Sequence, residues 1–332
     1  MGTRFFRPSA ARRLATAMGA LLASVSALPA QGWLVLPFAN RSGETSLDWL
    51  GDGFAISLEE ILSASGQTIL THDKAREVVS QWRVPQRHSV TLASALKAAD
   101  HTSAARVVIG SFVLRDGELR VQGKVLNAEE PAVLGEVEES ARLGDLFELQ
   151  RRLGRALLRA GQEGLSSSQS VRDSSPAPPL TAYEQYVRAL IQARPEERLQ
   201  ALRQAAHSFP AYPVLHYRLA AELHEAGKDD DALQSLERLS EVRFALSPEA
   251  RLLRAEILLE RGDAAAAEVA ATAALDLRDT YRARLLRAEA LLARGQSEPA
   301  RADLEKARQL GAPAEDADAL SRRLPAAAPA SP

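Results

Sequence analysis

The 332-residue chain contains no cysteine. Disulfide bonds are therefore excluded, and the fold must be held together by its hydrophobic core. A structural zinc site would need histidine and carboxylate ligands alone, because thiolates are missing. We also expect no lipid anchor, since a lipoprotein carries a cysteine at the point where its signal is cleaved.

An excess of positive charge is missing as well. The chain has 41 Lys and Arg against 43 Asp and Glu, a net charge of −2. Four of the 41 bases and none of the acids fall in residues 1–30, so the remainder has 37 bases, 43 acids and a net charge of −6. Nucleic-acid-binding proteins carry a basic excess that neutralises phosphates, so no nucleic-acid partner is expected.

Long apolar segments are missing beyond residue 30. Residues 1–30 predict a secretory signal, with a basic start that includes Arg12 and Arg13, an apolar run at 14–28 and small residues ending in Ala30. The apolar run is short for a membrane span, and an uncleaved anchor is the alternative. We expect an exported protein, periplasmic or envelope-associated, without a transmembrane segment once the signal is removed.

Catalytic motifs are scarce. No pair of the six histidines has HExxH spacing, and no GxSxG occurs. Glu59 and Glu60 are neighbours in a helical pattern and cannot face each other, so they predict a solvated surface. We therefore predict no catalytic residue, no metal site and no cofactor, and a protein that is not an enzyme.

The composition divides the chain into two folded parts. Residues 165–180, LSSSQSVRDSSPAPPL, are dominated by serine and proline and indicate a flexible linker. The tail at 323–332 is predicted to be disordered for the same reason. The predicted organisation is a signal at 1–30, an α/β domain at 31–162, a linker at 163–180, a helical repeat region at 181–322 and the tail.

The first part alternates strand and helix patterns. The sequence predicts a small layered α/β domain with a mixed sheet, whose elements follow from apolar periodicity and turn residues. An Asp116-Gly117 turn between two alternating runs predicts a hairpin with one buried and one wet face. The predicted strands are 33–38, 68–72, 107–115, 118–127 and 132–137, and the predicted helices are 50–62, 73–82, 91–99 and 145–160.

The segment LVLPFANRSGETSLDWLGDGF at 34–54 resembles a phosphate-binding strand, loop and helix. A Walker loop needs lysine, and this loop has none. Gly51 and Gly53 fall inside the helical pattern that follows a predicted cap at Thr45, and glycine there costs about 1 kcal/mol against alanine. Close packing of this helix on the sheet explains them. A small-ligand receptor or enzyme using the loop is the alternative function. The candidate ligand loop consists of Asn40, Arg41, Ser42 and Gly43.

The second part repeats. RLLRAEILLERGD starts at Arg251 and RLLRAEALLARGQ at Arg284, 33 residues apart. Such a period indicates helix-turn-helix units that stack on their neighbours. Each unit also has a turn glycine with alanine seven residues before it and five after it. These positions are Gly227, Gly262 and Gly295, with Ala220, Ala255 and Ala288 before them and Ala232, Ala267 and Ala300 after them. This pattern resembles tetratricopeptide repeats over 181–322, with three clear units that follow a degenerate first unit at 181–210, which Thr181 is predicted to cap.

The first part resembles the amino-terminal domain of TolB and its relatives in the CsgG and FlgO group of bacterial envelope proteins. The resemblance lies in the order of Pro37-Phe38, the loop at 40–43, Asp52-Gly53, the strand start at 109–111 and the DLFELQ helix at 145–150. It implies an envelope interaction module without catalytic residues. No six-bladed propeller follows, as one does in TolB itself.

Together the two resemblances predict an exported scaffold protein that binds a partner protein or peptide. Tetratricopeptide arrays usually bind peptides in a groove lined by the first helix of each unit. Acidic residues interleaved with leucine favour a basic and apolar partner, and a solvated helix face is the alternative. Self-association is a further alternative, and the sequence leaves the oligomeric state open. The predicted groove residues are Tyr217, His224, Glu225, Leu252, Glu256, Glu260, Leu285 and Glu289.

Overall fold

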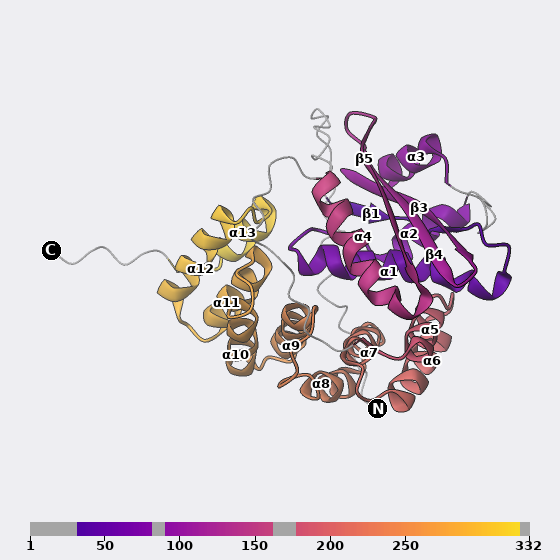
Figure 1. The fold of residues 1–332 in the computed structure, drawn as a ribbon. Coiled ribbons are helices and arrows are strands. Elements are labelled where there is room, and N and C mark those ends of the chain that lie inside the picture. The colour runs from indigo at the N-terminus through magenta and orange to yellow at the C-terminus, as the bar shows by residue number, and fades with distance from the viewer. Residues whose placement is uncertain (1–31, 82–89, 162–176, 326–332) are drawn as a thin grey trace, which may run out of the picture.

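The structure, a computed structural model, describes residues 32–81, 90–161 and 177–325 (Figure 1). The predicted signal, most of the predicted linker and most of the predicted tail lie outside these residues. The described chain forms a small α/β domain followed by an all-helical array, as the sequence predicts. Within the described ranges no helix is both long and apolar enough to span a membrane.

The α/β domain is built on a five-stranded mixed sheet in the order β1-β3-β4-β5, with β2 also paired to β3. β1 and β2 run parallel to β3, whereas β3, β4 and β5 form an antiparallel meander. The strands are β1 (Trp33–Val35), β2 (Ala39–Asn40), β3 (Arg106–Arg115), β4 (Glu118–Asn127) and β5 (Ala132–Arg142). The helices are α1 (Trp49–Ala64), α2 (His72–Gln81), α3 (Leu92–Thr102) and α4 (Leu146–Gly161), with short 3-10 helices at Thr45–Leu47 and Leu143–Asp145.

The predicted hairpin is confirmed. Asp116 and Gly117 both have positive φ, 53° and 77°, which suits the right-handed twist of the flanking strands. In β4 Leu119 and Val121 are fully buried, and Arg120 between them is exposed. One face of the sheet packs against α1 and α4, whereas α2 and α3 cover β1 and the start of β3 on the other.

Two predicted features at the start of the domain are wrong. The strand predicted at 33–38 ends at Val35, because Pro37 cannot donate a ladder hydrogen bond and separates β1 from β2. The strand predicted at 68–72 is reduced to one bridge between Ile69 and Trp33, and α2 already begins at His72.

Two predicted helix caps are also wrong. Thr45 starts a short 3-10 helix, and its side chain caps nothing. α1 begins only at Trp49, after Asp48, whose carboxylate accepts a hydrogen bond from Asn40 instead. Thr181 lies inside a helix that begins at Leu180.

Nine helices follow in the described residues and form an arc of packed pairs (Figure 1). The turn glycines Gly227, Gly262 and Gly295 have φ of 70°, 83° and 74°, the left-handed conformation that ends a helix at little cost for glycine. The paired alanines around each turn are fully buried, which lets adjacent helices approach closely. The helices are α5 (Leu180–Leu190), α6 (Pro195–Ser208), α7 (Pro213–Glu225), α8 (Asp229–Glu237), α9 (Ser247–Glu260), α10 (Ala264–Leu275), α11 (Tyr281–Ala293), α12 (Ser297–Gln309) and α13 (Ala314–Ser321).

Candidate interaction surface

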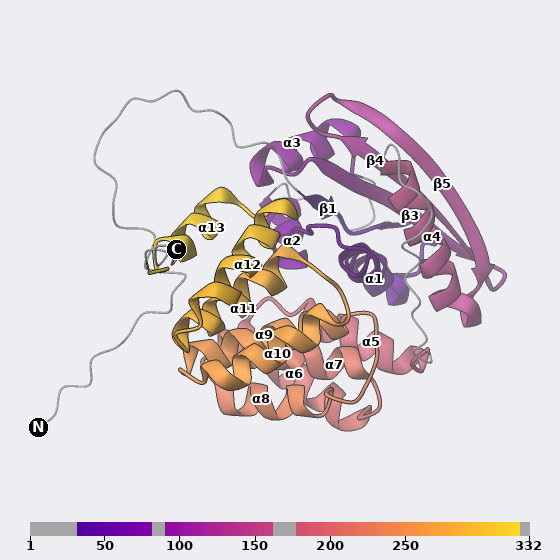
Figure 2. The same cartoon turned by 90° about the vertical axis from the view of Figure 1, so that its left-hand side faces the viewer.

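Helix α1 lies between the sheet and the inner side of the helical arc. Figure 1 shows α5, α7 and α9 on the side of the arc that faces α1, with α6, α8 and α10 outside them. Figure 2 shows α1 end-on between the sheet and the array. Every residue of α1 from Trp49 to Glu59 is buried, which is expected of a helix covered on both sides. α1 therefore lies along the inner side of the arc that α5, α7 and α9 form.

Tyr183 of α5 joins the two parts near the start of α1. Its hydroxyl donates to the carbonyl oxygen of Gly53, accepts from Gln150 Nε2 at 2.9 Å and lies 2.7 Å from Ser57 Oγ. Trp49 and Phe147 pack edge-on against its ring, with centroids 5.9 and 5.2 Å away. Burial raises the pKa of Tyr183, so the phenol stays protonated and keeps donating.

Glu60 makes the next contact along α1. Tyr186 of α5 donates to Glu60 Oε1 at 2.5 Å, and Arg218 of α7 lies 3.7 Å from the same oxygen. Arg218 also donates to the Tyr186 hydroxyl at 3.2 Å. Burial and the charge of Glu60 raise the pKa of Tyr186 well above its ordinary value. The carboxylate is thus held by groups from two helices of the array.

Arg278 closes the far end of α1. It lies between α10 and α11, and its Nη1 donates to the carbonyl oxygens of Ser63 and Ala64, both at 2.8 Å. The last carbonyls of a helix lack intrahelical partners and carry partial negative charge, so a guanidinium there is favourable. Glu249 of α9 pairs with Arg278 and accepts from Ser63 Oγ at 3.3 Å. The array therefore contacts α1 from Gly53 to Ala64.

A buried charge cluster holds α2 against α1. His72 Nε2 lies 3.2 Å from Asp52 Oδ1, and its Nδ1 lies 3.2 Å from Glu59 Oε1. Burial alone would lower the pKa of His72, but the charges and hydrogen bonds of Glu59 and Asp52 outweigh it and raise that pKa to about 9. Arg76 of α2 donates to the carbonyl oxygen of Ile191 in the array at 3.2 Å. The predicted solvated surface at Glu59 and Glu60 is wrong, because both carboxylates bind buried partners.

The predicted groove residues fall into different environments. Tyr217 is half-buried beneath the Arg218 guanidinium, which lies 5.6 Å from its ring centre. The prediction that Leu252 faces a partner is wrong. Leu252 is 5% exposed and packs with Ala274 and Ala283 between helices.

Five further predicted groove residues lie on α7, α9 and α11. Glu225 and Glu260 are exposed, whereas Leu285 is half-buried against α12. Glu289 pairs with Arg323 at 2.8 Å. Glu256 is half-buried, and its carboxylate makes no ion pair within the described ranges. Among the predicted acids, Glu225, Glu256 and Glu260 are therefore open to a partner, whereas Glu289 is already paired.

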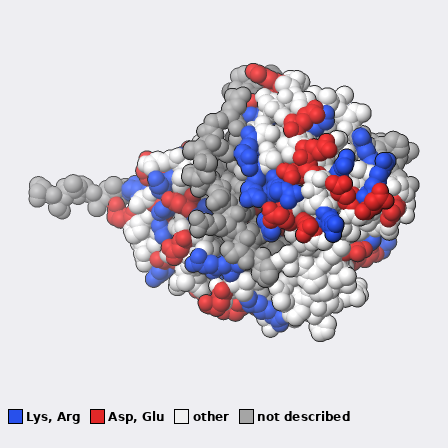
Figure 3. All heavy atoms as spheres, in the orientation of Figure 1, with Lys and Arg blue, Asp and Glu red and all other residues white. Residues whose placement is uncertain are grey.

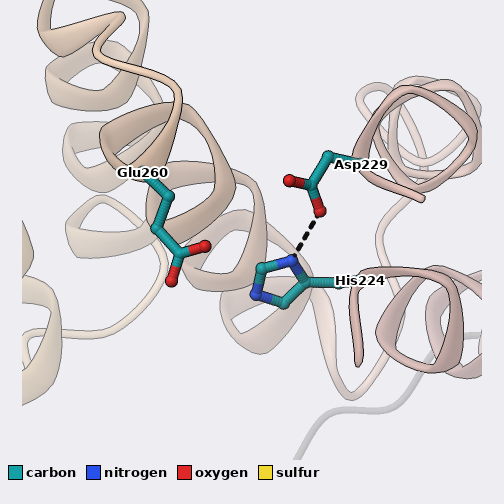
Figure 4. A group of neighbouring side chains, drawn as sticks. All are labelled: His224, Asp229 and Glu260. Atoms are coloured by element: carbon teal, nitrogen blue, oxygen red, sulfur yellow. Dashed lines mark hydrogen bonds and ion pairs between the residues drawn. The ribbon is translucent and has the colours of Figure 1, made fainter. Parts of the chain in front are cut away.

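The structure brings His224 and Glu260 together with Asp229 (Figure 4). His224 Nδ1 lies 2.8 Å from Asp229 Oδ1, and Glu260 points toward the ring from α9. One ligand atom from each residue lies within 4.8 Å of the others. The group offers three donor atoms of the kind that bind divalent cations. Without a cation, the pair of His224 and Asp229 closes the turn between α7 and α8.

The candidate ligand loop is fastened by its own polar groups. Asn40 is buried, and its Nδ2 donates to the Glu44 carbonyl oxygen and to Asp48 Oδ1, both at 2.8 Å. Its Oδ1 accepts from the Ser42 amide at 2.9 Å, while Ser42 Oγ accepts from the Leu114 amide at 2.8 Å. Arg41 and Gly43 are exposed. The Asn40 and Ser42 side chains therefore hold the loop to β3 and to the segment that precedes α1.

Close packing at the glycines of α1 is confirmed in two different directions. A Cβ on Gly51 would lie 2.2 Å from the carbonyl oxygen of Phe38, between β1 and β2. A Cβ on Gly53 would lie 3.2 Å from the Tyr183 hydroxyl. Gly51 therefore lets α1 approach the sheet domain, and Gly53 lets it approach the array.

We expect Gly51→Ala to lower the free energy of unfolding by about 2–3 kcal/mol, because the new methyl group meets backbone that cannot rotate away. Urea denaturation followed by circular dichroism measures the loss. The control is Ala93→Gly on the exposed face of α3. Gly66→Ala would not serve, because Gly66 has positive φ and an alanine there is strained without any contact. The Ala93→Gly control should cost only about 1 kcal/mol. Equal losses in the two variants would contradict the assigned contact.

No protein-family model matches the chain, and no curated protein is similar to it in sequence. Among solved structures, the chain is similar to the LpoB C-terminal domain from Salmonella enterica, at 13% identity and a TM-score of 0.26. That similarity covers 35% of this chain and 87% of the LpoB domain. At this TM-score it establishes nothing about function.

Proposed function

We propose that the chain is an exported, non-enzymatic scaffold protein of the bacterial cell envelope. In this proposal a TolB-type domain holds a tetratricopeptide-type array, and the array binds a basic and apolar segment of a partner protein. The sequence support is the 33-residue repeat and the order of envelope-domain motifs in residues 34–150. The array of packed helix pairs supports a binding role, because stacked units form extended surfaces.

The observation that carries the proposal is a group of three carboxylates beyond the end of α1, called the acidic surface below: Glu256, Glu260 and Glu289. α1 reaches only as far as Glu249 and Arg278, through Ser63 and Ala64. Further along α9 and α11, Glu256, Glu260 and Glu289 are half-buried or exposed. Because Glu256 has no ion-pair partner among the residues that the structure describes, a lysine or arginine of a partner would gain a partly desolvated ion pair there.

The test is photocrosslinking in the cells that produce the protein. A photoreactive residue at Glu260 should give one discrete crosslinked protein, identified by mass spectrometry, whereas the same residue at the exposed Glu305 of α12 should give none. Charge reversal at Glu256 and Glu289 should reduce that product at least about tenfold, because each reversal places like charges together. Glu305→Lys is the matched control and should leave the yield unchanged.

Either of two results would reject the acidic surface as the binding site. One is no product from Glu260. The other is a product whose yield survives both charge reversals in a protein with unchanged melting temperature. A measured turnover of any substrate would reject the non-enzymatic part of the proposal.

A further inference from the structure

A pocket opens where the α/β domain meets the array. Its walls come from α1, α4, α5 with the residues just before it, the start of α7 and the segment before α9, and its volume is about 120 Å³. Four aromatic side chains line it: Phe147, Tyr183, Tyr212 and Phe244. An engineered apolar cavity of roughly 150 Å³ holds benzene, so this space suits a single ring or an aliphatic group of that size.

Four polar side chains in the pocket wall, Ser57, Glu60, Gln150 and Tyr183, already have partners. Ser57, Gln150 and Tyr183 share the hydrogen bonds around the Tyr183 hydroxyl. Glu60 is held by Tyr186 and by Arg218. Because these groups need no further partners, the interior favours an apolar body over a sugar or a nucleotide base.

The rim carries an excess of positive charge. Arg151 and Arg155 line the pocket and lie 2.6 and 3.5 Å from Glu148, so one carboxylate serves two guanidinium groups. The hydrogen bond from Arg151 lowers the pKa of Glu148, which keeps that carboxylate ionised. Figure 3 shows Lys and Arg atoms gathered over α4. An anionic group of a ligand would therefore be attracted to the rim.

Tyr212 adds a neutral hydroxyl donor to the pocket wall. Its ring packs edge-on against Tyr186 with centroids 5.7 Å apart. Its hydroxyl makes no hydrogen bond within the described part of the chain, and burial raises its pKa well above the ordinary value. This hydroxyl and the two arginines line the same pocket, and a protonated phenol can donate to a carboxylate oxygen.

We propose that this pocket binds a small monocarboxylic acid, with a single ring or a similarly sized aliphatic body between the aromatic side chains and the carboxylate at Arg151 and Arg155. The site is separate from the acidic surface of α9 and α11, and separate from the loop at 40–43. It goes beyond the proposed scaffold function, because its occupant is a small molecule.

Isothermal titration calorimetry on the full chain tests the site, with 3-phenylpropionate as the probe. We expect a dissociation constant below about 1 mM, within the range available to a ligand of this size. The neutral 3-phenylpropan-1-ol should bind at least about tenfold more weakly, and so should acetate, which lacks the ring. The double variant Arg151→Gln/Arg155→Gln should lose about tenfold in affinity for 3-phenylpropionate. Arg159→Gln, exposed on the same helix and outside the pocket, is the matched control.

Both arginines are on the surface, at 36% and 50% exposure, so the double variant should keep the wild-type melting temperature. No binding at about 10 mM 3-phenylpropionate would overturn the proposal, since such affinity is below that of a formed pocket. Equal affinity for the alcohol, or unchanged affinity in the double variant, would overturn the assignment of the carboxylate. The scaffold proposal has a separate readout, the crosslink at Glu260, so the two can fail independently.

Discussion

Replacing His72 with alanine should lower the free energy of unfolding by about 3–5 kcal/mol, measured by urea denaturation. The imidazolium lies between Asp52 and Glu59, and both carboxylates are at most 5% exposed. Removing the cation leaves two buried carboxylates close together, with Arg76 3.7 Å from Asp52 as the remaining cation of this cluster among the described residues. Breaking a buried ion pair costs far more than losing a surface pair, because the remaining charge stays desolvated.

The same site makes stability depend on pH in a defined direction. The pKa of His72 is raised to about 9 in the folded chain, against 6.5 when unfolded. A raised pKa means that the folded state holds the proton more tightly, so the stabilisation is complete below pH 6.5 and is lost as the pH rises through 9. We expect the unfolding free energy of the wild type to fall over this window more steeply than that of the His72→Ala variant.

His101→Ala is the control, because His101 is exposed at the end of α3. It should change the unfolding free energy by no more than about 0.5 kcal/mol and leave the pH profile unchanged. Parallel pH profiles for the wild type and His72→Ala would show that His72 is not charged in the folded protein.

Tyr183→Ala should cost about 3–5 kcal/mol, because it removes a fully buried aromatic side chain at the contact of α1 with the array. Tyr183→Phe separates the hydroxyl from the ring. It should cost about 1–3 kcal/mol, since Ser57 and Gln150 lose the partner that satisfied them in the buried site.

Tyr281→Phe is the matched control for the hydroxyl. Tyr281 starts α11, and its hydroxyl makes no hydrogen bond in the portion that the structure describes. We expect a change of no more than about 0.5 kcal/mol from it. Denaturation curves for the three tyrosine variants give the comparison, and equal losses for Tyr183→Phe and Tyr281→Phe would contradict the hydrogen-bond network.

Local patterns in the sequence predicted the elements that depend on near neighbours. The hairpin follows from alternation around Asp116-Gly117, and the array follows from a period of 33 with turn glycines. Each repeated unit contacts chiefly the units beside it, so the information needed to place its helices lies within about two periods. The same reasoning explains why the paired alanines around Gly227, Gly262 and Gly295 are buried as expected.

The surface of α1 could not be predicted in this way. Asp52, Glu59 and Glu60 interrupt its apolar pattern and suggest a face in water, but their partners lie 13 to 158 residues further along the chain. A helix with apolar residues on one side and small or polar residues on the other gives no sign that a second module covers it. The signal that was available is the pair of glycines, because two glycines in one helix indicate close contacts on two sides.

The groove was predicted incompletely for the same reason, namely that local patterns do not show which distant element covers a surface. A groove lined by the first helix of each unit is a local property, and α5, α7 and α9 do line the inner side of the arc. What fills it is not local, because α1 belongs to the preceding domain. Tyr217 is therefore half-buried near this contact, whereas Glu256 and Glu260 lie beyond it and stay available.

Because α1 packs on the sheet and is bonded to α5, α7 and the segment before α11, the two modules are expected to move as one rigid body. Since the chain has no cysteine, spin labels at Lys97→Cys on α3 and Glu305→Cys on α12 report one distance, measured by pulsed electron paramagnetic resonance. We predict a single narrow distance distribution, which Tyr183→Ala broadens. If the distance between the two labels instead spreads over about 20 Å in the protein with Tyr183 intact, as expected of modules joined only by a flexible chain, the rigid body is contradicted.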